Sequence, residues 1–172
     1  MEQIFSAVRR LAEAHPDVRF VYPVHPSPAV QETASRLLGN VPRVELIEPL
    51  DTFDMHRLMS RCYMVMTDSG GIQEEAPSLG KPVLVLRRET ERPEAVKAGT
   101  VLIAGVETEK IVSLASALLE DGALYSRMAQ AVNPYGDGHA CERIADAICY
   151  MFGYAQTPPE RFSPTGTASR PS

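Results

Sequence analysis

Short apolar runs alternate with segments of helical periodicity along most of the chain. The apolar runs have the length and the β-branched or aromatic content of buried strands, and no hairpin dipeptide joins one run to the next. Strands separated in this way by helices form right-handed crossovers and lie parallel in a sheet. The order therefore predicts an α/β domain with a Rossmann-like, doubly wound parallel sheet. Strands are expected at 18–24, 44–47, 63–67, 82–86 and 100–104, and helices at 4–12, 28–38, 51–61, from 71, 93–98, 108–119, 124–131 and 138–152.

Length and composition predict how much of the chain folds. A chain of 172 residues, 44% of them apolar, has the apolar surface for one substantial core, and we expect one domain over residues 1–152. Residues 153–172 are rich in Pro, Ser and Thr, which predicts a disordered tail. Helical periodicity begins at Ile4 with no strand before it, which is the pattern of a domain entered in its middle.

Charge and cysteine content exclude several classes of protein. The net charge is −5 and the 17 basic residues are scattered, so we expect no nucleic-acid partner. The three cysteines, Cys62, Cys141 and Cys149, lack Cys-x-x-Cys spacing, which predicts buried reduced thiols rather than a disulfide framework or a zinc site. No apolar run approaches the roughly 18 residues of a membrane span, and no export signal is visible. We therefore expect a cytoplasmic protein without a membrane partner.

The segment Thr67-Asp68-Ser69-Gly70-Gly71-Ile72-Gln73-Glu74-Glu75 leaves an apolar run and enters a helix. Two glycines allow close approach of a ligand, and the free N–H groups of a helix start attract an anion such as a diphosphate. Glu74 or Glu75 could then accept hydrogen bonds from a ribose, but neighbours on a helix diverge by about 100°, so only one faces inward. A simple turn is the alternative interpretation. NAD is disfavoured because the Gly-x-Gly-x-x-Gly fingerprint is absent.

Two further features follow predicted strands and carry polar groups. The segment 87–94 brings three arginines and three glutamates to the same edge of the sheet, either as a phosphate clamp or as a solvated charged loop. His25 ends the first predicted strand and is either structural or a ligand contact. The other histidines have no partners at metal-ligand spacing, and we expect no metal site.

The chain resembles the C-terminal domain of the non-hydrolysing UDP-N-acetylglucosamine 2-epimerases. The resemblance extends to about residue 149, and the long block TDSGGIQEEAPSLGKPVLVL is its most specific part. Other matching segments are VYPVHP at 21–26, TERPEAV at 90–96, AGT at 98–100 and NPYGDG at 133–138.

The resemblance implies one half of a glycosyltransferase-B-type fold, in which two Rossmann-like domains enclose the active site. Members of the family interconvert UDP-N-acetylglucosamine and UDP-N-acetylmannosamine. They remove the C2 proton and expel UDP to give 2-acetamidoglucal, then add UDP back. The resemblance implies that no cofactor or metal takes part and that the full-length protein is a homodimer.

Matching positions imply roles for several residues. Ser69, Gly70 and Gly71 would bind the diphosphate, Glu75 the ribose and Arg92 the phosphates. Leu50 and Met55 would contact the uracil.

The resemblance also bears on two other positions. Relatives have an aromatic ring where Met55 stands, and Phe53 is the alternative stacking residue. His25 would correspond to a histidine near a regulatory UDP-sugar site.

The resemblance also predicts what this chain does not supply. The family's proton-transferring carboxylates lie in an N-terminal catalytic domain, so we expect no catalytic residue here and no turnover by this chain alone. The donor domain of a UDP-sugar glycosyltransferase and a non-catalytic UDP-sugar sensor are the alternatives. UDP and UDP-N-acetylglucosamine are the expected ligands.

Overall fold

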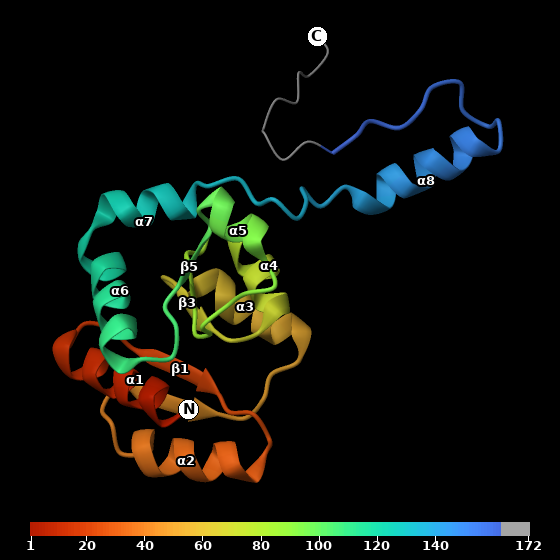
Figure 1. Cartoon of the computed structure of the whole chain (residues 1–172). Coiled ribbons are helices and arrows are strands. Elements are labelled where there is room, and N and C mark those ends of the chain that lie inside the picture. The colour runs from red at the N-terminus through yellow and green to blue at the C-terminus, as the bar shows by residue number, and fades with distance from the viewer. Residues whose placement is uncertain (163–172) are drawn as a thin grey trace.

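The protein's structure, a computed structural model, describes residues 1–162 and alternates short strands with helices (Figure 1). The strands lie at the predicted positions: the second has the predicted bounds, the third is shorter at its start, and the other three are shorter at both ends. They are β1 (Phe20–Pro23), β2 (Val44–Ile47), β3 (Val65–Thr67), β4 (Val83–Val85) and β5 (Val101–Ile103). The helices are α1 (Glu2–Ala14), α2 (Pro28–Leu38), α3 (Thr52–Arg61), α4 (Gly70–Ser78), α5 (Pro93–Ala98), α6 (Thr108–Glu120), α7 (Gly122–Ala129) and α8 (Ala140–Met151).

All strand pairs recorded among the described residues are parallel, which confirms the predicted crossover topology. The strands form two hydrogen-bonded segments with no recorded pairing between them, a two-stranded one with the order β1-β2 and a three-stranded one with the order β3-β4-β5. Phe20 pairs with Val44 in the first segment, and Val65 pairs with Val83 in the second. Phe20 also packs against the core clusters of both segments, so the two share apolar contacts.

Helices cover both faces of the β3-β4-β5 segment, as a doubly wound domain requires. One core cluster contains Leu11 of α1 and Leu118 of α6 packed with Leu84. The other contains Met59 of α3 and Ala76 of α4, together with Val83 and Val85. Because it is the central strand, β4 is buried on both faces, and its sequence is therefore continuously apolar. Figure 1 shows α6 on one side of these strands and α3 and α4 on the other.

Parallel pairing brings the ends of β3 and β4 to one edge of the sheet. The chain leaves β3 after Thr67 and starts α4 at Gly70, and it leaves β4 after Val85 to form the arginine loop, residues 87–92. The Leu86 N–H donates to the Thr67 carbonyl at 2.9 Å, which fixes the two exits side by side. This edge is where ligands bind in open parallel sheets.

Helix α8 projects from the body, and none of its residues is buried (Figure 1). The prediction of three buried thiols is therefore wrong for Cys141 and Cys149, which are exposed, whereas Cys62 is half-buried. The prediction followed the usual burial of free cysteines, but both of these residues lie on α8, which has no buried residue. No helix in residues 1–162 is long and apolar enough to cross a membrane.

The predicted disordered tail lies only partly within the structure. Residues 153–162 contain no helix or strand, and residues 163–172 lie outside the described residues.

Candidate functional site

The start of α4 is built to expose backbone N–H groups. Ser69 is the N-cap with extended backbone, and its own N–H donates to the Thr67 hydroxyl oxygen at 3.0 Å. A Cβ atom at Gly71 would lie 3.6 Å from Glu75 Oε1 and 3.9 Å from Ser69 Oγ. Glycine here therefore keeps an open approach to the helix N-terminus, where an anion is favoured.

The two glutamates of the predicted ribose position diverge, as helical geometry requires. Glu74 forms an ion pair with Arg92 through the arginine Nε. Glu75 lies 2.9 Å from His56 Nε2 through its Oε2. Only Glu75 lines the same cavity as Leu50 and Met55, so the structure separates the two candidates that the sequence left open.

This cavity, called the Glu75 cavity below, has a volume of about 180 Å³. Its lining residues are Leu50, Asp51, Thr52, Met55, His56 and Glu75. Asp51 caps α3 by accepting from the Asp54 N–H at 2.8 Å, which fixes where the helix carrying Met55 and His56 begins. The cavity therefore has an apolar side at Leu50 and Met55 and a polar side at Glu75.

Phe53, the alternative stacking residue, lies outside the Glu75 cavity. Its side chain is 70% exposed, and its ring packs under the Arg57 guanidinium at 5.6 Å. The position of Met55, rather than that of Phe53, therefore faces the space where a base would lie.

Every arginine of the arginine loop is paired with a glutamate. Arg87 donates to Glu91 at 3.0 Å, and Arg88 lies 3.4 Å from Glu107. The ion pair with Glu74 raises the pKa of Arg92. A phosphate bound beside Arg92 would therefore compete with or join the Glu74 carboxylate.

Glu91 lies over the first glycine of α4. A Cβ atom at Gly70 would lie 2.5 Å from Glu91 Oε1. The pKa of Glu91 is lowered, mainly by a hydrogen bond from the backbone N–H of Glu91 and to a smaller extent by the charges of Arg87 and Arg92. The side chain is therefore a carboxylate at neutral pH. The position above Gly70 therefore already holds a negative group.

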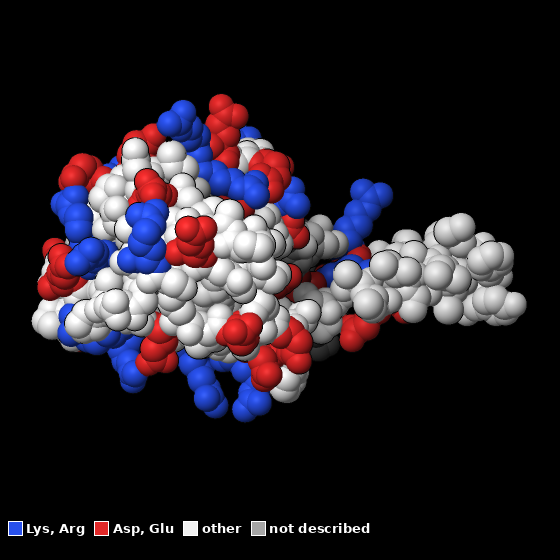
Figure 2. All heavy atoms as spheres, turned by 90° about the horizontal axis from the view of Figure 1, so that it is seen from below, with Lys and Arg blue, Asp and Glu red and all other residues white. Residues whose placement is uncertain are grey.

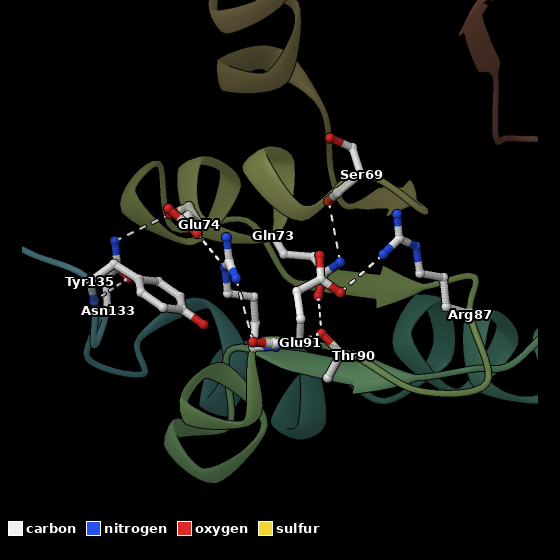
Figure 3. Close-up of polar contacts among 9 residues, drawn as sticks. Ser69, Gln73, Glu74, Arg87, Thr90, Glu91, Asn133 and Tyr135 are labelled. Atoms are coloured by element: carbon white, nitrogen blue, oxygen red, sulfur yellow. Dashed lines mark hydrogen bonds and ion pairs between the residues drawn. The ribbon is translucent and has the colours of Figure 1, made fainter.

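Gln73 connects the two loops and was missed by the sequence analysis. Its side chain is fully buried, donates through Nε2 to the Ser69 carbonyl at 3.3 Å and accepts from the Thr90 hydroxyl at 2.6 Å (Figure 3). Thr90 Oγ1 in turn accepts from the Arg92 N–H at 3.0 Å. The signal in the sequence is a glutamine three residues before Ala76, on the helix face that is otherwise apolar.

The NPYGDG segment supports α4 from outside the sheet. Asn133 Nδ2 donates to the Glu74 carbonyl at 3.4 Å, and Asn133 Oδ1 accepts from the Tyr135 N–H at 3.2 Å (Figure 3). Tyr135 packs against the cluster that contains Ala76 and Ala95, and burial raises the pKa of its phenol.

His25 is exposed at the turn between β1 and α2. Its Nδ1 accepts from the Ser27 N–H at 3.1 Å, and this contact closes the turn. This contact accounts for a structural role, and the ring's Nε2 edge is the part that could meet a ligand.

A second and larger cavity, of about 420 Å³, lies at the other end of α4. It lies between Pro77, Ser78 and Gly80 on one side and residues 133–138 on the other. Its lining comes from the end of α4 and from residues 129–138 rather than from the residues that follow β3 or β4, so volume alone does not make it the nucleotide site. At the α4 start, N–H groups that favour an anion, a carboxylate and a cavity with an apolar side follow one another in space. This arrangement suits a nucleoside diphosphate.

Comparison with known proteins gives a consistent result. A family model described as UDP-N-acetylglucosamine 2-epimerase matches residues 1–149. The UDP-N-acetylglucosamine 2-epimerase of Bacillus subtilis is 50% identical over 163 residues, which is 95% of this chain and 43% of the relative.

Two solved structures are also similar. An S. aureus structure solved with UDP has a TM-score of 0.88 and 49% identity, covering 94% of this chain and 44% of that one. A UDP-GlcNAc 2-epimerase from Neisseria meningitidis, bound to UDP-GlcNAc, has a TM-score of 0.82 and 46% identity, covering 87% of this chain and 40% of that one. The chain therefore spans less than half the length of these relatives.

Proposed function

This chain belongs to the UDP-N-acetylglucosamine 2-epimerase family, and from that premise we propose that it is the UDP-binding part of such an enzyme. The whole enzyme would interconvert UDP-N-acetylglucosamine and UDP-N-acetylmannosamine by eliminating UDP and adding it back. We propose that residues 1–152 form the UDP-binding domain and that the protein is located in the cytoplasm. The two-domain arrangement would be of the glycosyltransferase-B type, and the full-length protein a homodimer.

One observation carries this proposal: the α4 start and the Glu75 cavity are continuous through Glu75. Glu75 Oε1 lies near Gly71, and the same side chain lines the cavity with Leu50 and Met55. A diphosphate at the α4 N–H groups would leave its ribose at Glu75, and the base would extend toward Leu50 and Met55. The order of binding groups therefore matches the order of phosphate, ribose and uracil in UDP.

The phosphates would be held by backbone and by charge. Ser69, Gly70 and Gly71 would supply the helix N-terminus, and Ser69 a hydroxyl donor. Arg92 would reach the phosphates by exchanging or sharing its contact with Glu74. The Glu91 side chain would have to move aside, because its carboxylate occupies the position above Gly70 where a phosphate would lie.

Proton transfer at C2 would come from the missing part of the enzyme. Of the carboxylates beside the proposed nucleotide, Glu74 pairs with Arg92, Glu75 with His56 and Glu91 with Arg87. Positioned acid and base groups are needed on both faces of the sugar when the configuration inverts. We therefore propose that this chain alone leaves the C2 hydrogen of UDP-N-acetylglucosamine unexchanged in deuterated water.

The exposed face of α8 supports the proposal of a further domain. Ile144, Ile148, Met151 and Phe152 recur at helical spacing and are 50–77% exposed. In the view of Figure 2, the outer part of the projecting segment shows no charged side chains, whereas charges of both signs lie at its base and over the body. Such a face gains about 25 cal/mol for each Å² that a partner covers. A regulatory UDP-sugar site at His25 remains a second proposal for the assembled enzyme.

Calorimetry of UDP binding tests the proposed function. We expect weak binding of UDP and of UDP-N-acetylglucosamine, because one wall of the cleft is missing, and no heat from NAD. Glu75→Ala should weaken the binding of UDP by about 1.5–3 kcal/mol, the cost of losing a charged hydrogen-bond acceptor, and should leave the binding of inorganic pyrophosphate nearly unchanged. Glu32→Ala, on the exposed face of α2, is the control. Equal losses for UDP and pyrophosphate would remove Glu75 from the ribose role.

A further inference from the structure

His56 and Glu75 come from different helices and meet at the Glu75 cavity. The imidazole Nε2 of His56, on α3, lies 2.9 Å from Glu75 Oε2, on α4. Both side chains are 47% exposed, and both line the cavity beside Leu50 and Met55. The pair therefore faces the space that we assign to the nucleoside rather than the core.

The contact with His56 sets the direction of the Glu75 carboxylate. With Oε2 at the imidazole, Oε1 lies on the side of Gly71, 3.6 Å from where a Cβ atom would stand. An exposed glutamate without such a partner has several rotamers to choose from, and ordering it on binding costs entropy. A carboxylate oxygen has two acceptor sites, so Oε2 can keep the His56 contact and still accept a hydroxyl.

We propose that His56 is a positioning residue that holds the Glu75 carboxylate ready for the two hydroxyls of a ribose. This inference rests on the proposed function and adds a specificity-determining residue to it. His56 performs this role as an N–H donor through Nε2, which both the imidazolium and the neutral tautomer protonated on Nε2 provide. The consequence is discrimination between ribose and sugars that lack these hydroxyls.

A purely structural role for the pair makes a different prediction. Under either role, losing the contact should scarcely change the melting temperature, because half-exposed ion pairs contribute little to the free energy of folding. The two roles differ in what they predict for ligand binding. If His56 only joined α3 to α4, its loss would disturb every ligand of the site equally. If His56 positions Glu75, its loss weakens only ligands that carry ribose hydroxyls.

The test measures Kd for UDP and for 2′,3′-dideoxy-UDP on the 172-residue chain. We expect His56→Leu to raise the Kd for UDP about three- to tenfold, which corresponds to the loss of one net hydrogen bond, and to leave the Kd for dideoxy-UDP unchanged. His56→Gln, whose amide can donate to the same carboxylate, should stay within about twofold of the unsubstituted chain for both ligands. The matched control is His139→Leu, which breaks another exposed His–Glu pair, with Glu142 at 2.8 Å on α8.

The outcomes separate this inference from the proposed function. If the unsubstituted chain binds UDP and dideoxy-UDP equally, or if Glu75→Ala leaves their ratio unchanged, the ribose role of Glu75 fails and the proposed function with it. If that ratio depends on Glu75 but His56→Leu leaves it unchanged, or weakens both ligands alike, the positioning role of His56 is overturned and the proposed function stands.

Discussion

Gln73→Ala is expected to destabilise the protein by separating the α4 start from the arginine loop. The Gln73 side chain is fully buried and links the Ser69 carbonyl to the Thr90 hydroxyl. Truncation removes both hydrogen bonds, leaves the half-buried Thr90 hydroxyl without its acceptor and opens a cavity, whereas the Ser69 carbonyl still accepts from the Gln73 N–H at 3.3 Å. The Thr90 oxygen still accepts from the Arg92 N–H, which keeps part of the loop in place.

The magnitude follows from these contacts. Two lost hydrogen bonds at about 1 kcal/mol each and one poorly satisfied partner predict a loss of about 3 kcal/mol. For a protein of this size that is a fall in melting temperature of roughly 6–12 °C. Gln73→Met, which keeps most of the volume but not the hydrogen bonds, should show most of this loss, whereas the same truncation at exposed Gln31 on α2 should cost under about 0.5 kcal/mol.

Thermal unfolding followed by circular dichroism measures the effect directly. The reasoning requires Gln73→Ala to melt well below Gln31→Ala. Equal melting temperatures for these two variants would refute the view that Gln73 holds the two loops together. A melting temperature for Gln73→Met close to that of the unsubstituted protein would instead assign the effect to volume.

Two further predictions concern cysteine reactivity and acid stability. Iodoacetamide at pH 8 should modify exposed Cys141 and Cys149 before Cys62, because burial raises the pKa of the Cys62 thiol; equal rates in peptide mass spectrometry would contradict this. Asp137 pairs with Arg143 at 2.6 Å, and this contact lowers the pKa of the Asp137 carboxyl. The ion pair therefore contributes to stability at pH values above the unfolded pKa of about 3.9, and this contribution is lost as the pH falls through the lower folded pKa. Asp137→Asn should therefore reduce α8 helicity at pH 7, and circular dichroism should show the difference vanishing only in strong acid.

The alternation of strands and helices could be predicted because it depends on local patterns. The continuously apolar β4 and the glycine pair before α4 are features of the chain itself, and the structure places both elements close to the expected residues. Strand ends were less predictable. β1 begins at Phe20 rather than at residue 18, because pairing with β2 rather than composition decides where a ladder starts.

Contacts between loops could not be predicted in the same way. The bond of Gln73 to Thr90 and that of Glu75 to His56 join residues 17 and 19 positions apart, and both depend on how α3 and α4 pack on the sheet. The exposure of Cys141 and Cys149 was missed because free cysteines are usually buried, and the sequence did not show that α8 projects from the body. An amphipathic helix indicates that a partner surface exists but does not say whether that surface lies within the same body.

The measurement that tests our central claim most directly is a titration of the 15N-labelled chain with UDP, followed by amide chemical shifts. We predict that the largest changes fall on Ser69, Gly70 and Gly71 and on the residues lining the Glu75 cavity, with no change on adding NAD. Shifts confined to the larger cavity near Gly80 and Gly138, or no shift at saturating UDP, would contradict the claim that the α4 start binds this nucleotide.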